Sequence, residues 1–119
     1  MFDGKNRRAN FRLHYPPGAG PILVAGGVSV HVLELSERGI LFAGDAPGPG
    51  HDVAGVLTFP DGITTSISGV VVRAVQGRVA VRLTRAISLG RVLAEQRRVM
   101  RTFPGFLSVR SARGDRQEA

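Results

Sequence analysis

The chain has 119 residues, enough for one domain with a single core, and its 43% hydrophobic and 21% charged residues are typical of a soluble globular protein. It contains no cysteine, which excludes a disulfide framework and cysteine-based zinc sites. No apolar run approaches the roughly 20 residues of a membrane span, and no apolar core follows the basic N-terminus. We therefore expect a cytoplasmic protein without membrane insertion.

The formal net charge of +7 is concentrated at the two ends of the chain. Residues 1–12 hold four cationic side chains and one acid, residues 13–84 four arginines and five acids, and residues 85–119 eight arginines and three acids. Codon bias can account for the abundance of arginine but not for this clustering. Such a field attracts an anionic partner, whether nucleotide, nucleic acid, lipid head group or acidic protein.

Residues 1–12 are expected to form a flexible basic arm. The arm carries Arg7, Arg8 and Arg12 within six residues, just ahead of the first apolar run. A chain start is usually frayed, so structure alone requires no such cluster there. Each guanidinium is a planar fork of donors that suits a phosphate group or the edge of a guanine base.

Residues 13–84 are predicted to be β-structure, because short runs rich in valine and isoleucine alternate with Gly, Pro and Asp. The longest run contains Gly69, where we expect a bend or a bulge. The runs predict strands over residues 22–24, 28–32, 40–43, 53–59, 63–75 and 78–83.

The alternation of apolar side chains slips by one position just before Leu33. Apolar residues occupy even positions over 28–32, whereas Leu33 and Leu35 occupy odd positions. Strand side chains alternate between faces, so the slip predicts a bulge or a strand end. It also places Glu34 and Ser36 together on the outer face. They form either an ordinary solvated strand end or a polar recognition pair.

The C-terminal part of the chain changes to a helical period. Ser88 is a suitable N-cap, and Pro104-Gly105 predicts that the helix ends at Phe103, so we expect a helix over about 88–103. Residues 108–119 are polar and are expected to be a disordered tail. The predicted apolar face comprises Leu89, Val92, Leu93, Gln96 and Met100, with Arg91, Glu95 and Arg98 on another face.

Many short strands followed by one terminal helix predict an all-β fold with a C-terminal helix. Residues 13–107 are expected to form this single domain, a small antiparallel barrel or sandwich. The helix is expected to cover an open end of the barrel, where it would protect exposed sheet edges.

Two motifs make the chain resemble the PilZ domain, a bacterial receptor module for cyclic di-GMP. The family pattern RxxxR matches Arg8-Ala9-Asn10-Phe11-Arg12, and its pattern [D/N]xSxxG matches Glu34-Leu35-Ser36-Glu37-Arg38-Gly39 with one departure. That departure is Glu34, which stands where the family has Asp or Asn. The helix sequence Glu95-Gln96-Arg97-Arg98, followed by Phe103-Pro104, is also similar to the family.

The resemblance implies a six-stranded antiparallel barrel with a C-terminal helix. It implies that Arg7, Arg8 and Arg12 grip the phosphates and guanines of cyclic di-GMP. Glu34 would read guanine, Ser36 would support the site, and Gly39 would permit the turn. The implied function is a receptor or adaptor whose arm changes conformation on ligand binding and relays the signal to a downstream protein partner.

Two alternatives remain open. Some members of the PilZ family act through protein contacts without binding nucleotide. A small nucleic-acid-binding barrel is favoured by the charge, but aromatic residues are only 6% of the chain, and single-strand binders need exposed stacking platforms.

An enzyme is not expected, and neither a metal nor a cofactor is predicted. The three histidines lie in separate segments without a metal-binding spacing. Ser36 has no nucleophile elbow, and no glycine-rich phosphate loop opens a helix.

Overall fold

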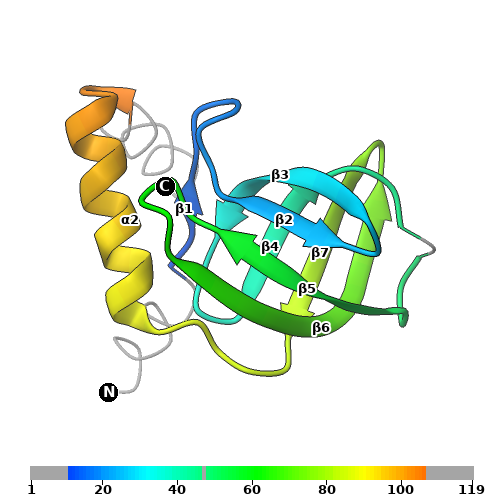
Figure 1. Ribbon diagram of the computed structural model, residues 1–119. Helices are drawn as coiled ribbons and strands as arrows, with labels where there is room; N and C mark the ends of the chain where they lie inside the picture. The colour runs from blue at the N-terminus through cyan, green and yellow to red at the C-terminus, as the bar shows by residue number, and fades with distance from the viewer. Residues whose placement is uncertain (1–10, 47, 107–119) are drawn as a thin grey trace, which may run out of the picture.

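The computed structural model describes residues 11–46 and 48–106 (Figure 1). Residues 1–10 of the predicted arm, which include Arg7 and Arg8, lie outside the described residues. The predicted tail, residues 108–119, also lies outside them.

A closed antiparallel β-barrel forms the body of the described chain (Figure 1). Six strands follow one another around the barrel in the order β3-β2-β5-β6-β7-β4, and pairing of β3 with β4 closes it. This confirms the predicted six-stranded barrel. An additional strand, β1, pairs with β3 and was not predicted. The strands are β1 (Leu13–His14), β2 (Ile22–Ala25), β3 (Val28–Leu35), β4 (Gly39–Ala43), β5 (Asp52–Thr58), β6 (Thr64–Val75) and β7 (Arg78–Leu83).

The core fills the barrel because alternate side chains of each strand point inward. On β7, for example, Val79, Val81 and Leu83 are buried while the residues between them are not. Phe42 and Phe59 belong to this core, as the strand patterns predict, and neither is available as an exposed stacking surface.

Two strands of the barrel are bulged. The register of β3 against β4 shifts between Val32 and Glu34, which confirms the bulge predicted from the phase slip. The register of β6 against β7 shifts between Val71 and Arg73, so β6 is bulged as predicted for this strand, but the bulge does not lie at Gly69. Gly69 lies in the regular ladder, where an added Cβ would sit 2.4 Å from the carbonyl oxygen of Arg82. Glycine there permits close approach of β6 and β7.

The helix α2 (Leu89–Thr102) lies across one end of the barrel, as predicted, and runs beside β1 (Figure 1). The Ser88 hydroxyl accepts a hydrogen bond from the backbone N–H of Arg91 at 3.0 Å, the interaction expected of an N-cap. Phe103 is the C-cap, and its N–H donates to the carbonyl of Val99.

The face that α2 turns toward the barrel differs from the predicted apolar face. Val92, Glu95 and Val99 are buried, whereas Met100 is 53% exposed. The predicted assignment failed because it placed Glu95 on a different face from the apolar residues. Tyr15, which follows β1, and the helix's own Arg91 and Arg98 supply hydrogen-bond donors for this carboxylate, so the helix can bury it.

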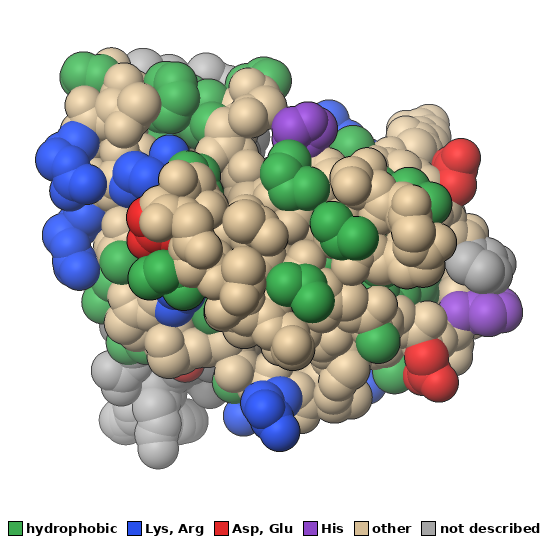
Figure 2. All heavy atoms as spheres, in the orientation of Figure 1, with side chains coloured by type: hydrophobic (Ala, Val, Ile, Leu, Met, Phe, Trp, Pro, Cys, Tyr) green, Lys and Arg blue, Asp and Glu red, His purple; other side chains and the backbone are tan. Residues whose placement is uncertain are grey.

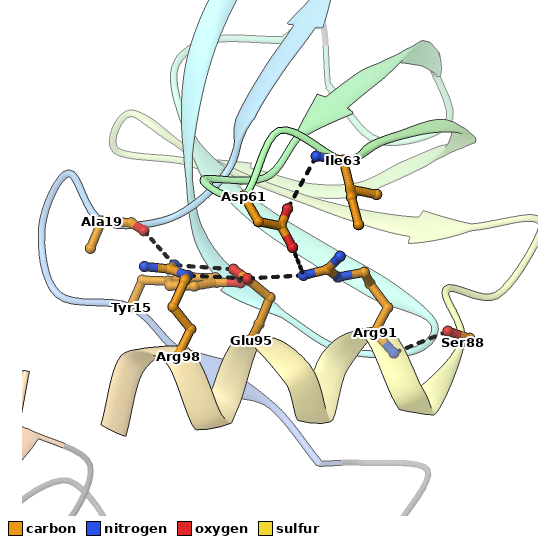
Figure 3. Close-up of polar contacts among 8 residues, drawn as sticks. All are labelled: Tyr15, Ala19, Asp61, Ile63, Ser88, Arg91, Glu95 and Arg98. Carbon is orange, nitrogen blue, oxygen red and sulfur yellow. Dashed lines mark hydrogen bonds and ion pairs between the residues drawn. The ribbon is translucent and has the colours of Figure 1, made fainter. Parts of the chain in front are cut away.

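A polar cluster around Glu95 docks α2 on the barrel (Figure 3). The Glu95 carboxylate accepts hydrogen bonds from the Tyr15 hydroxyl at 2.8 Å, from Arg98 through two nitrogens at 3.1 Å, and from Arg91 at 3.3 Å. Burial, and after it the nearby Glu95 carboxylate, raises the pKa of Tyr15 above its ordinary value. The hydrogen bonds to Glu95 raise the pKa of Arg98.

Charge is unevenly distributed over the surface. Figure 2 shows Lys and Arg side chains gathered over α2, where Arg97 and Arg101 are exposed, while uncharged side chains dominate the barrel face in view. Over the residues that the structure describes, no helix is long and apolar enough to cross a membrane.

Candidate functional site

One row of outward-facing residues runs across four neighbouring strands of the barrel. The ladder pairs Arg73 on β6 with Ala80 on β7, Ala80 with Leu41 on β4, and Leu41 with Glu34 on β3. Three interstrand spacings of about 4.8 Å separate the ends of the row, roughly 14 Å in all. The row therefore has an acid at one end, a cation at the other and two half-buried apolar side chains between them.

This row forms part of a pocket of about 340 Å³. Five charged residues line it: Arg12, Arg38, Arg73, Arg82 and Glu34. All four arginines are solvent-exposed, so folding does not require their charges. The lining thus carries an excess of three positive charges over an apolar floor, an arrangement that favours an anion with a flat apolar part.

The two β-bulges lie on the two flanking strands of the pocket. The bulge in β3 immediately precedes Glu34, and the bulge in β6 immediately precedes Arg73. A bulge inserts one residue and re-aims the side chains that follow it. Each bulge therefore resets the alternation of side chains along its strand, so that the charged residue after it faces the pocket.

Glu34 is held at the edge of the pocket. Its carboxylate lies 3.2 Å from Nδ1 of His14, which faces it on β1, and its side chain is 24% exposed. This contact leaves the carboxylate accessible while restricting its position. An ordinary solvated glutamate lacks that restriction, because a long exposed side chain samples several rotamers.

Ser36 and Gly39 shape the turn that leads from β3 into β4. The Ser36 hydroxyl donates to the carbonyl of Gly39 at 3.2 Å, and the Ser36 N–H donates to the same oxygen at 3.0 Å. A Cβ on Gly39 would lie 3.2 Å from the carbonyl oxygen of Val81, a tight contact. Glycine thus allows close packing on β7 without displacing that carbonyl. It pairs with Arg82 and adds no side chain beside that guanidinium.

Four of the six predicted site residues line the same pocket: Arg12, Glu34, Ser36 and Gly39. Arg7 and Arg8 lie outside the described residues. The sequence interpretation missed three pocket arginines. Arg38 was visible inside the second motif, whereas Arg73 and Arg82 come together only through the register of β6 and β7.

Within residues 11–46 and 48–106, no group of three or more histidine or acidic side chains is placed to hold a metal ion. Comparisons of the chain with family models, curated proteins and solved structures found no match.

Proposed function

We propose that this protein is a receptor for cyclic di-GMP that relays ligand binding to a protein partner. One observation carries the proposal. Arg12 from the first motif and Glu34, Ser36 and Gly39 from the second, which lie far apart in sequence, line one pocket. The resemblance of these motifs to the PilZ pattern indicates cyclic di-GMP as the ligand. The excess positive charge of the pocket is compatible with this anion.

The chemistry of the ligand matches the lining of the pocket. Cyclic di-GMP has two phosphates and two guanines. Glu34 can accept hydrogen bonds from the N1–H and N2–H donors of guanine, while the ring covers Leu41 and Ala80. The exposed arginines can pair with phosphate oxygens or bidentately with guanine N7 and O6. Arg38, Arg73 and Arg82 extend this capacity beyond the predicted set.

Arg12 is the described residue through which the arm would act. It directly precedes Leu13 of β1 and lines the pocket. Ligand binding to Arg12, with Arg7 and Arg8, would change the conformation of the arm at the pocket. Such a conformational change alters the surface that a partner meets, a common route to a molecular switch.

Glu34 is compatible with the role of the family's Asp or Asn. Its extra methylene carries the carboxylate outward by about one bond length and adds a torsion that must be ordered on binding. The contact with His14 at 3.2 Å already limits that freedom. Glu34 therefore presents its carboxylate to the pocket from a partly fixed position.

Titration calorimetry with cyclic di-GMP tests the proposal. A micromolar site corresponds to about 8 kcal/mol and would be nearly saturated at a free ligand concentration of about 100 μM. Cyclic di-AMP is the matched control, because it keeps both phosphates but lacks the guanine donors read by Glu34. Absence of binding by either dinucleotide would favour the adaptor that acts by protein contact alone. A steeply salt-dependent affinity for a short oligonucleotide, without dinucleotide binding, would favour the nucleic-acid-binding barrel.

A further inference from the structure

Four consecutive residues connect the pocket to α2. Arg12 lines the pocket, and His14 contacts the Glu34 carboxylate at its edge. The next residue, Tyr15, donates its hydroxyl hydrogen bond to Glu95 on α2 at 2.8 Å. The segment that brings Arg12 to the pocket is thus tied directly to the helix at the end of the barrel.

The β-ladder alone holds this segment weakly. β1 pairs with β3 through only two residue pairs, Leu13 with Leu35 and His14 with Glu34. One further backbone bond, from the Tyr15 N–H to the carbonyl of Leu33 at 3.0 Å, extends the pairing. So short an edge strand needs other contacts to fix its position.

Burial of Leu13 in the core supplies one such contact, and α2 supplies the polar ones. Tyr15 is buried, and its hydroxyl meets the fully buried Glu95 carboxylate. Arg98 holds the same carboxylate through two nitrogens and also donates to the carbonyl of Ala19 at 2.9 Å. Figure 3 shows that Glu95 and Arg98 project from the same side of α2 toward Tyr15 and Ala19. The loop that follows β1 is therefore clamped at both of these residues.

We propose that Tyr15 and Glu95 are positioning residues for the nucleotide pocket, fixing β1 so that Arg12 and His14 face the ligand and Glu34. This inference rests on the proposed function. By linkage, a ligand that favours this placement of β1 also tightens the contact of α2 with the barrel.

The chemistry of Glu95 supports a role in positioning its partners, beyond a contribution to the stability of the contact between α2 and the barrel. A buried carboxylate must be desolvated, and apolar side chains of similar size often stabilise a protein as well or better. Val92 and Val99 already supply apolar contacts for α2. The directional bonds of Glu95, by contrast, admit one placement of the Tyr15 hydroxyl and of Arg98.

Two variants separate positioning from stability. Tyr15→Phe removes the hydroxyl bond to Glu95 and keeps the ring. Ser88→Ala removes the N-cap of α2 without touching β1, and so serves as the matched control for helix destabilisation. Tyr15→Phe is expected to weaken cyclic di-GMP binding at least about fivefold, the lower end of typical couplings. Ser88→Ala should leave the affinity unchanged, even where both variants lose thermal stability.

The single tyrosine provides a direct reporter, because the chain has one Tyr and no Trp. Labelling tyrosine with carbon-13 at Cζ gives one resonance, from the atom that bears the hydroxyl. Addition of cyclic di-GMP should shift this resonance, although Tyr15 is not among the residues that line the pocket. In the Glu95→Gln variant the shift should be smaller.

The outcomes distinguish the two proposals. Failure of the parent protein to bind cyclic di-GMP contradicts the proposed function, and positioning is then judged without ligand. In that case amide hydrogen exchange of residues 13–15 should be faster in Tyr15→Phe than in Ser88→Ala, and equal rates overturn the positioning role. If the parent binds without a shift of its Cζ resonance and Tyr15→Phe binds equally well, the receptor proposal stands and the positioning role is wrong.

Discussion

At the scale of single residues, Arg12 connects the sequence motif to the pocket. It is exposed and lines the pocket. Arg12→Ala is expected to lower the affinity for cyclic di-GMP at least about tenfold, or about 1.4 kcal/mol, because charge-assisted bonds to phosphate are lost. Calorimetry measures this change. Arg78→Ala is the matched control, since Arg78 is also exposed but does not line the pocket. Equal losses in both variants would indicate a general charge effect instead of a site.

Glu34 carries the proposed recognition of guanine. Glu34→Gln keeps the size of the side chain but replaces one acceptor oxygen with an amino group that faces the guanine donors. The affinity for cyclic di-GMP is expected to fall by about tenfold, since a buried donor would lose its acceptor. Binding of cyclic di-AMP, titrated in parallel, should change much less. An unchanged affinity for cyclic di-GMP would remove Glu34 from the guanine-reading residues.

At the scale of elements, Asp61 links the β5–β6 turn to α2. Its carboxylate accepts hydrogen bonds from the Ile63 N–H at 3.1 Å and from Arg91 at 3.0 Å (Figure 3). These two bonds, the backbone one first, hold the pKa of Asp61 below its ordinary value of 3.8. A lowered pKa in the folded state means that the contribution to stability is present above the unfolded pKa and is lost as the pH falls through the folded one.

The expected result is a pH-dependent effect of Asp61→Asn. The difference in the free energy of unfolding between the parent and this variant should be larger at about pH 6 than at about pH 2, because protonation of the Asp61 carboxylate at falling pH removes the charge that the variant lacks. Urea denaturation at the two pH values measures it. Added salt at the higher pH should shrink the difference, because the ion pair with Arg91 is exposed on the Asp61 side. A difference independent of pH would contradict the role of the charge.

Replacing two glycines by alanine, one in a strand and one in the helix, is expected to change the free energy of unfolding in opposite directions. In β6, a Cβ on Gly69 would lie 2.4 Å from the Arg82 carbonyl oxygen, so Gly69→Ala should lower the free energy of unfolding by about 1–3 kcal/mol through overpacking. In α2, a Cβ on Gly90 would come no closer than 4.0 Å to the Ser88 hydroxyl oxygen. Gly90→Ala should therefore raise the stability by about 1 kcal/mol. Chemical denaturation tests both, and a stabilising Gly69→Ala would contradict the observed strand packing.

At the scale of the whole molecule, local patterns were enough to predict most of the barrel. Alternation located the six barrel strands, and the phase slip before Leu33 located the bulge in β3. Ser88 and Phe103 marked the helix ends because caps have local sequence signatures. The two-residue strand β1 was missed because so short a segment has no period to detect.

Features that depend on long-range register could not be predicted. The pocket arginines Arg73 and Arg82 meet Glu34 only because β6, β7, β4 and β3 are neighbours with one particular register. The bulge in β6 was misplaced at Gly69 because a glycine in a strand signals either a bulge or a close approach. The buried face of α2 was misjudged because the partners of Glu95 come from the barrel, as Tyr15 does, as well as from the helix itself.

Amide chemical-shift mapping with cyclic di-GMP tests the central claim most directly, because it reports binding and its location together. The largest shifts are expected for residues 34–41 and for residues 72–73 and 80–82, which surround the pocket. The amide resonances of β2 and β5, which lie opposite β7 and β4 in the strand order of the barrel, should shift little. The absence of shifts at a ligand concentration of about 100 μM, or shifts concentrated on β2 and β5, would contradict a cyclic di-GMP receptor site at this pocket.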